Sequence, residues 1–153
     1  MKSLTLTILI VAAFGAVSAK IEYKDCGSKV GKLLAVQLNP CKDSPCVLQK
    51  GNNYTINATF GMIETTDTAM SQISGIIDGV AVPFPINNPN ACTDKNSGLK
   101  CPLENGKTYS YTTTIAVLSE YPDIKVIVKW QLMDASKEGN VIVCLETPVA
   151  ITG

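Results

Sequence analysis

The six cysteines carry the clearest chemistry in this sequence, and their spacing favours disulfide bonds over metal binding. Six cysteines can pair in fifteen ways. Proximity along the chain favours one scheme, in which the two close pairs bond and the two outer cysteines join: Cys41 with Cys46, Cys92 with Cys101, and Cys26 with Cys144. Zinc is the competing interpretation, but the sequence has no histidine and no CxxC pair. We therefore expect three disulfides and no metal site.

Catalytic chemistry has little support in the residue inventory. Ser-His-Asp and Cys-His machinery both need an imidazole, and the chain has none. A pair of carboxylates could serve glycoside hydrolysis, but the candidates fall mostly in turns or at outward positions, which predicts solvated surface charge: Asp25, Glu64, Asp123, Asp134 and Glu146. No phosphate-binding or calcium-binding loop pattern is present. We expect a binding protein without a cofactor, not an enzyme.

The charge of the chain argues against nucleic acid as a partner. Lysine and arginine together number 13, aspartate and glutamate also number 13, and every basic residue is a lysine. Without arginine or a basic run, the chain lacks the side chains that form bidentate hydrogen bonds with phosphates and base edges. We expect no nucleic-acid partner.

The N-terminal segment is typical of a secretory signal peptide. Lys2 is followed by an apolar run over 4–14 and by the small residues Val17, Ser18 and Ala19. This pattern predicts a signal peptide at 1–19 and a mature domain at 20–153. A membrane anchor is the alternative, but the run is shorter than the roughly 20 residues that span a bilayer. We expect a protein that is secreted or held in an oxidising lumen, where disulfides persist.

Alternation of apolar and polar residues predicts β-strands along most of the mature chain. The clearest strands are predicted at 53–60, 108–117, 124–132 and 141–146. Weaker candidates are 31–38, 70–77 and 80–84. Residues 66–77 could also form a short amphipathic helix, although Gly75 and the β-branched residues around it favour a strand.

Turn residues such as Asp78-Gly79 and Glu104-Asn105-Gly106 separate these segments. About seven strands, each polar on one face, predict an all-β sandwich of two antiparallel sheets. Whether the inward side chains fill a solid core, as in an adhesion module, or line a hollow cannot be decided from periodicity alone.

Two N-glycosylation sequons lie on the polar side of the strand predicted at 53–60. They are Asn53-Tyr54-Thr55 and Asn57-Ala58-Thr59, and both asparagines would face solvent. Together with the predicted signal peptide, they indicate a secreted glycoprotein.

The order of several short motifs resembles the Niemann-Pick type C2 protein family, the ML lipid-recognition domain, in an arthropod-type member. The resemblance covers essentially the whole mature chain and all six cysteines. Its motifs are Asp25-Cys26-Gly27-Ser28, Pro83-Phe84-Pro85, Cys101-Pro102, Tyr109-Ser110-Tyr111, Ser119-Glu120-Tyr121-Pro122, Trp130-Gln131-Leu132 and Cys144-Leu145-Glu146.

The resemblance implies an immunoglobulin-like sandwich whose two sheets enclose an apolar cavity. It also implies that the cavity binds cholesterol or a related sterol and that the protein carries this ligand without changing it chemically. It implies the same disulfide scheme as the spacing. The family's pocket positions fall on Phe84, Val117 and Tyr121, with Trp130 deeper in the wall. The two prolines around Phe84 restrict its backbone, and Tyr121 offers an apolar ring with a hydroxyl that can stay wet.

Three positions depart from the family pattern. Asp78 replaces an apolar residue in the loop that members use to pass cholesterol to a lysosomal sterol-transport membrane protein, which is the further partner that the resemblance implies. Leu145 stands where members have a second tryptophan, and Ser74 where they have a histidine. We expect a monomeric sterol carrier. The alternatives are an extracellular carrier of fatty acids or semiochemicals and a lipid-sensing accessory protein of innate immunity.

Overall fold

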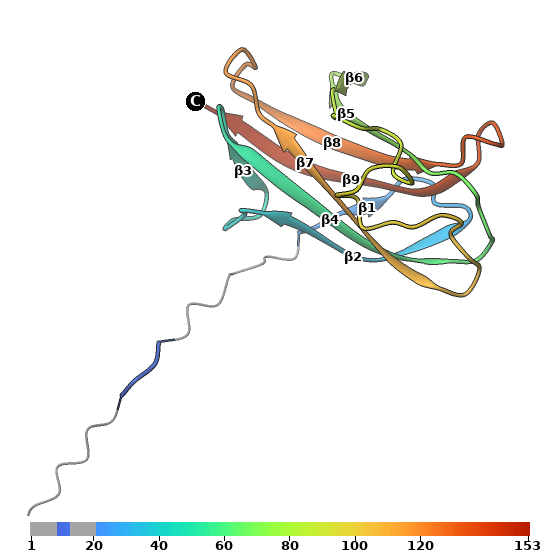
Figure 1. Ribbon diagram of the computed structural model, residues 1–153. Coiled ribbons are helices and arrows are strands. Elements are labelled where there is room, and N and C mark those ends of the chain that lie inside the picture. Colours follow the sequence, from blue (N-terminus) through green and yellow to red (C-terminus); the bar gives the residue numbers. More distant parts are fainter. Residues whose placement is uncertain (1–8, 13–20) are drawn as a thin grey trace, which may run out of the picture.

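The computed structural model describes residues 9–12 and 21–153, and its folded part consists of two β-sheets packed face to face (Figure 1). The predicted signal peptide falls mostly on residues 1–8 and 13–20, which lie outside the described residues. Within the described part of the chain, no helix is long and apolar enough to cross a membrane.

The larger sheet has six strands in the order β1-β9-β8-β5-β6, with β3 beside β9. These strands are β1 (Lys24–Asp25), β3 (Cys46–Gln49), β5 (Met70–Ile77), β6 (Val80–Phe84), β8 (Ile124–Met133) and β9 (Val141–Thr152). The smaller sheet has the order β2-β4-β7, formed by β2 (Gly31–Asn39), β4 (Asn53–Met62) and β7 (Thr108–Ala116). The prediction of an all-β sandwich is therefore confirmed.

All seven predicted strands are present, and two further strands are short. Residues 70–77 form β5, so the helical alternative for this segment is wrong. The two unpredicted strands are β1 and β3, of two and four residues. The pairing of β3 with β9 is parallel, whereas the other strand pairings are antiparallel.

Inward side chains of the two sheets fill the space between them. The largest fully buried side chains include Trp130 on β8, Tyr111 on β7 and Phe60 on β4. On β8 the buried residues alternate with more exposed ones, as the period-two pattern predicts: Val126, Val128, Trp130 and Leu132.

The two sheets approach most closely where β2 and β9 begin. The backbone N–H groups of Lys29 and Val30 both donate to the carbonyl of Val141, over 3.1 and 3.2 Å. A Cβ atom at Gly31 would lie 3.0 Å from the carbonyl oxygen of Ile142 and 3.0 Å from a methyl of Val143. A side chain here would force these neighbours to shift by a few tenths of an ångström, so glycine is favoured at this close approach. We call this side of the sandwich the closed end.

Three disulfides join the cysteines in the predicted scheme: Cys26–Cys144, Cys41–Cys46 and Cys92–Cys101. The first closes a separation of 118 residues and ties the segment after β1 to β9. The backbone N–H of Cys26 also donates to the carbonyl of Cys144 over 3.1 Å.

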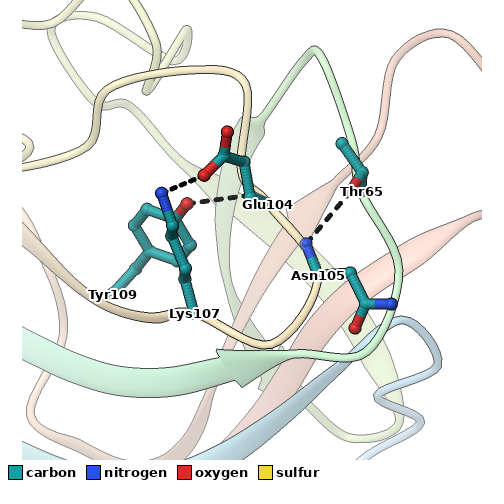
Figure 2. A network of polar contacts seen from close by, with 5 residues as sticks. All are labelled: Thr65, Glu104, Asn105, Lys107 and Tyr109. Carbon is teal, nitrogen blue, oxygen red and sulfur yellow. Dashed lines mark hydrogen bonds and ion pairs between the residues drawn. The ribbon is translucent and has the colours of Figure 1, made fainter.

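The turns use the residues that the sequence predicts. Asp78 (φ 49°) and Gly79 (φ 77°) are both left-handed and connect β5 to β6, so this pair forms the two-residue hairpin turn typical of Asp-Gly. Figure 2 shows the turn that leads into β7, where Glu104 pairs with Lys107. The Tyr109 hydroxyl accepts the Glu104 N–H over 2.8 Å, and Thr65 accepts the Asn105 N–H over 3.0 Å.

One carboxylate contradicts the interpretation of solvated charge. Asp134 follows β8 at the closed end and is only 5% exposed. It accepts hydrogen bonds from the hydroxyls of Thr68 and Ser136, from the Ser136 N–H, and from the Asn140 amide. Burial raises its pKa, but these hydrogen bonds outweigh burial and lower the pKa to about 2. Asp134 fastens the β8–β9 hairpin to the segment before β5.

Candidate functional site

Two aromatic rings meet at the end of the sandwich opposite the closed end. Phe84 is the last residue of β6, and Tyr121 lies in the loop between β7 and β8. Their ring centroids are 5.4 Å apart, with the planes at 72° in an edge-to-face arrangement. The resemblance assigns both residues to one pocket, and the structure brings their rings into contact.

The Phe84 ring covers Gly75 on the inner face of the larger sheet. A Cβ atom at position 75 would lie 2.8 Å from Cε2 of Phe84 and 3.0 Å from Cγ2 of Val126. The missing side chain at Gly75 therefore creates the seat for the ring. We refer to Phe84 and Tyr121 together as the aromatic gate, because they cover the space between the sheets at this end.

The gate has an apolar interior side and a wet exterior side. Both rings are half-buried. Burial raises the pKa of the Tyr121 hydroxyl, and the negative charge of Glu120 raises it further, so Tyr121 stays neutral at ordinary pH. Exposed aliphatic side chains lie on the neighbouring hairpin and loop: Val80 (64% exposed), Val82 (46%) and Leu118 (41%).

Val117 and Trp130 are both buried, but in different surroundings. Val117 follows β7, is 4% exposed, and is fixed by backbone hydrogen bonds to Gly51 (2.6 Å) and Asn52 (3.0 Å). Trp130 lies four residues beyond Val126 along β8 and stacks on Tyr111 of the opposite sheet, with ring centroids 5.1 Å apart. Trp130 is therefore buried between the two sheets, and its role in a pocket wall stays a prediction.

A polar cluster that sequence reasoning missed lies beside this stacked pair. The Tyr111 hydroxyl and the Trp130 indole N–H both donate to the Ser71 hydroxyl oxygen, each over 2.8 Å. Ser71 is 1% exposed and lies on the same face of β5 as Ile73 and Gly75. If Ile73 of the 70–77 strand is assigned to the inner face, the period of two places Ser71 on the same face.

The core near Leu145 is almost completely filled. A void of about 10 Å³ is lined by Ile21, Val36, Leu38, Leu48, Ile56, Ile115, Val128, Leu145, Thr147 and Val149. This volume is close to the minimum for one water molecule. The void is lined mainly by apolar side chains from both sheets, and an apolar cavity large enough for a sterol stays a prediction.

Phe84 also borders a hollow of about 480 Å³ on the outer face of the larger sheet. Its lining combines the polar residues Ser71, Gln72, Ser74, Lys129 and Gln131 with the apolar residues Ile73, Ala81, Pro83, Phe84, Ile86 and Pro89. A long apolar molecule would leave much of its surface in contact with water here.

The two sequons lie on the outer face of the smaller sheet, away from the gate's interior. Asn53 is exposed, whereas Asn57 is half-buried and its amide donates to the Thr112 hydroxyl over 2.8 Å.

Comparison with known proteins decides the family. A family model described as the ML domain matches residues 20–151. The chain belongs to the ML domain family. It is 42% identical to the mouse NPC intracellular cholesterol transporter 2, with 99% of each chain covered. It is 37% identical to the NPC intracellular cholesterol transporter 2 homolog a of Drosophila melanogaster, with 94% of this chain and 96% of that protein covered.

A solved structure supports the fold of this ML protein. The Niemann-Pick type C2 protein from the Japanese carpenter ant superposes with a TM-score of 0.78 at 27% identity, covering 86% of this chain and all of that chain. The fly and ant proteins support assignment to an arthropod-type Niemann-Pick type C2 group.

Proposed function

We propose that this protein is a carrier that binds cholesterol or a related sterol between its two sheets and releases it unchanged. The observation that supports the proposal most directly is the aromatic gate, in which Phe84 lies over Gly75 and contacts Tyr121. Behind it lies an apolar interior with Trp130 in its wall. The names of the mouse and fly relatives, both cholesterol transporters, support the choice of sterol.

Cargo would enter by displacing the gate and separating the sheets. The void near Leu145 has a volume of about 10 Å³, so a sterol that occupies it must expand it. Burial of roughly 400 to 600 Å² of sterol surface would contribute about 10 to 15 kcal/mol before the costs of association and of opening the core. We therefore expect dissociation constants between micromolar and nanomolar.

A carrier of fatty acids or semiochemicals is the second candidate. Leu145 lines the residual void, so the cavity formed on expansion would differ in shape from that of family members with a tryptophan there. A flexible acyl chain could fill such a space with less separation of the sheets than a rigid sterol.

The remaining roles follow from the same proposal. The protein would be secreted or lysosomal after removal of residues 1–19, act as a monomer, and carry glycans at Asn53 and Asn57, which lie on the outer face of the smaller sheet. The exposed Val80, Val82 and Leu118 would form a rim for transfer of cargo to a sterol-transport membrane protein. Asp78 does not contribute to that rim because it forms the hairpin turn.

A competition titration tests the proposal. Secreted protein is loaded with a fluorescent sterol, which is then displaced with cholesterol and, separately, with oleic acid. Displacement by cholesterol at sub-micromolar concentration supports the sterol carrier, whereas displacement mainly by oleic acid supports the second candidate. If no sterol and no fatty acid binds, the sandwich is a solid module and the proposal is wrong.

A further inference from the structure

A polar hollow of about 130 Å³ lies along β7, at an edge of the smaller sheet. Every residue that lines it has a carboxylate, amide or hydroxyl side chain, and these residues include Asn87, Asn88, Asp94, Asn96, Thr112 and Thr114. Amide and hydroxyl side chains both donate and accept hydrogen bonds. The lining therefore suits a neutral ligand that is rich in hydroxyl and amide groups, which is the chemistry of an N-acetylated sugar, and it does not suit apolar cargo.

Hydrogen bonds hold the far wall of this hollow against β7. The backbone N–H of Thr112 donates to the carbonyl of Ser97 over 2.9 Å. The backbone N–H of Asn96 donates to Oδ1 of Asp94, also over 2.9 Å. The hydrogen bonds found among the described residues use the backbone of Asn96 but not its side-chain amide. That amide is therefore available to a ligand in a wall whose backbone is fixed.

A glycan on Asn57 would begin at the border of the hollow. Asn57 on β4 lies directly opposite Thr112 on β7. Its Nδ2 atom, which is the atom that carries an N-linked glycan, lies 2.8 Å from Oγ1 of Thr112. Neighbouring strands are only about 4.8 Å apart, so a sugar bonded to this nitrogen extends over β7 and can reach the wall formed by Asn96.

The other sequon has no such neighbour. Asn53 lies four residues earlier on β4, which corresponds to about 13 Å at roughly 3.3 Å per residue. It is exposed, and the residue opposite it on β7 is Ala116, whose methyl group cannot form a hydrogen bond. A glycan on Asn53 would extend into solvent. The chain therefore supplies a second glycosylation site that serves as an internal control.

We propose that the hollow along β7 is the seat of the Asn57 glycan, with the first sugar lying against Thr112 and Asn96. This inference rests on the glycosylation that the proposed function includes, and it does not depend on the cargo. A seated sugar would stabilise the smaller sheet through its own hydrogen bonds. It would also cover part of β7, an edge strand to which another chain could otherwise add.

A glycan that stays in solvent is the competing explanation. Such a glycan is a bulky, solubilising surface group, and any effect that it has on stability should be similar at either sequon. A seated glycan should instead stabilise the fold only from Asn57, and mainly through its first sugar. The position and the length of the glycan are therefore the two variables to change.

The test uses two secreted proteins with one high-mannose glycan each: Asn53→Gln, which keeps the Asn57 glycan, and Asn57→Gln, which keeps the Asn53 glycan. Mass spectrometry establishes that the remaining sequon is modified. Each protein is studied intact, after endoglycosidase H, which leaves the first sugar, and after PNGase F, which removes the whole glycan. The midpoint of thermal unfolding is measured for all three forms.

For Asn53→Gln we expect endoglycosidase H to leave the midpoint unchanged and PNGase F to lower it by about 3 to 6 °C, the shift that one or two net hydrogen bonds supply. For Asn57→Gln we expect neither enzyme to change the midpoint measurably.

A wall variant tests the seat itself. Asn96→Ala, combined with Asn53→Gln, should reduce the loss on PNGase F treatment to less than half. PNGase F leaves aspartate at position 57 with or without the wall substitution, so that change cancels from the comparison. Asn105→Ala is the matched control because Asn105 is also an exposed asparagine but does not line the hollow, and it should keep the full loss.

Several results would overturn the inference. These are an unmodified Asn57, equal losses of stability from the two sequons, a loss that appears already after endoglycosidase H, and a full loss that persists in Asn96→Ala. Sterol affinity is measured on the intact and stripped proteins and should be the same for both. If the seat fails while sterol still binds, the carrier proposal stands, and if no sterol binds, the stability comparison still decides the seat.

Discussion

The closed end of the sandwich and the aromatic gate are held together by different forces. At the closed end, the backbone N–H groups of Lys29 and Val30 donate to the carbonyl of Val141 on the other sheet. Asp134 accepts hydrogen bonds from Asn140 within its own hairpin and from Thr68 before β5. At the gated end, Phe84 and Tyr121 meet through an edge-to-face ring contact. The closed end is fixed by directional bonds, whereas the gate is closed by a contact that two side chains can give up by rotating.

This contrast indicates where the sandwich can open. An edge-to-face aromatic pair contributes about 0.5 to 1.5 kcal/mol beyond its buried area. Breaking buried backbone hydrogen bonds costs more, because each unpaired group adds a desolvation penalty of about 1 to 3 kcal/mol. Separation of the sheets around cargo should therefore begin at Phe84 and leave the closed end intact.

Removal of the long-range disulfide should give the largest effect on stability. The Cys26→Ala/Cys144→Ala variant releases a loop of more than a hundred residues, and the chain-entropy model assigns about 4 to 5 kcal/mol to such a bridge. The matched control Cys41→Ala/Cys46→Ala releases a separation of 5 residues and should lose about 2 kcal/mol. Urea unfolding monitored by Trp130 fluorescence measures both. Equal losses of unfolding free energy in the two variants would show that the length of the closed loop does not determine how much a bridge stabilises the fold.

Truncation of the gate should weaken binding more than folding. Phe84→Ala removes a ring expected to contact cargo, and we predict a loss of about 2 to 4 kcal/mol in binding free energy. Val47→Ala is a suitable control because this side chain is 44% exposed on β3 and far from the gate in sequence and sheet order. Titration with the fluorescent sterol gives the comparison. Unchanged affinity in a folded Phe84→Ala protein would remove Phe84 from the site.

Protonation should loosen the closed end in acid. The folded pKa of Asp134 is about 2, below its ordinary value of 3.8, so its carboxylate stabilises the fold above about pH 4. That contribution, about 2 kcal/mol, is lost as the pH falls towards 2. Asp134→Asn should therefore be less stable than wild type at pH 7, and the difference should shrink to nearly zero at pH 2. Stability curves at several pH values test this, and a constant difference would contradict it.

The sequence predicts the strands well where a long strand has one buried and one wetter face. The alternation on β4, β7 and β8 is long enough to identify these strands and their faces, whereas residues 142–145 of β9 are all buried. The strands β1 and β3 escape this method because two or four residues carry too little periodic signal. The parallel pairing of β3 with β9 depends on contacts between distant segments, which local pattern does not encode.

The site is less visible in the sequence than the fold. Phe84 and Tyr121 are 37 positions apart, and the resemblance to a family, not periodicity, grouped them. Serine in a strand suggests an outward position, so Ser71 was missed, although Tyr111 and Trp130 satisfy its oxygen inside the core. Asp134 was misread for a similar reason, since the partners that bury it, such as Thr68, come from a different part of the chain.

The position of Pro83 has a consequence for aggregation. β6 forms an edge of the larger sheet (Figure 1), and it exposes Val80 and Val82 beside the gate. An exposed apolar edge strand is a template on which another chain can add a strand. Pro83 has no N–H, so it interrupts the row of donors that such an added strand would need. The chain can therefore keep an apolar rim in water beside its gate while discouraging edge-to-edge association of its own copies.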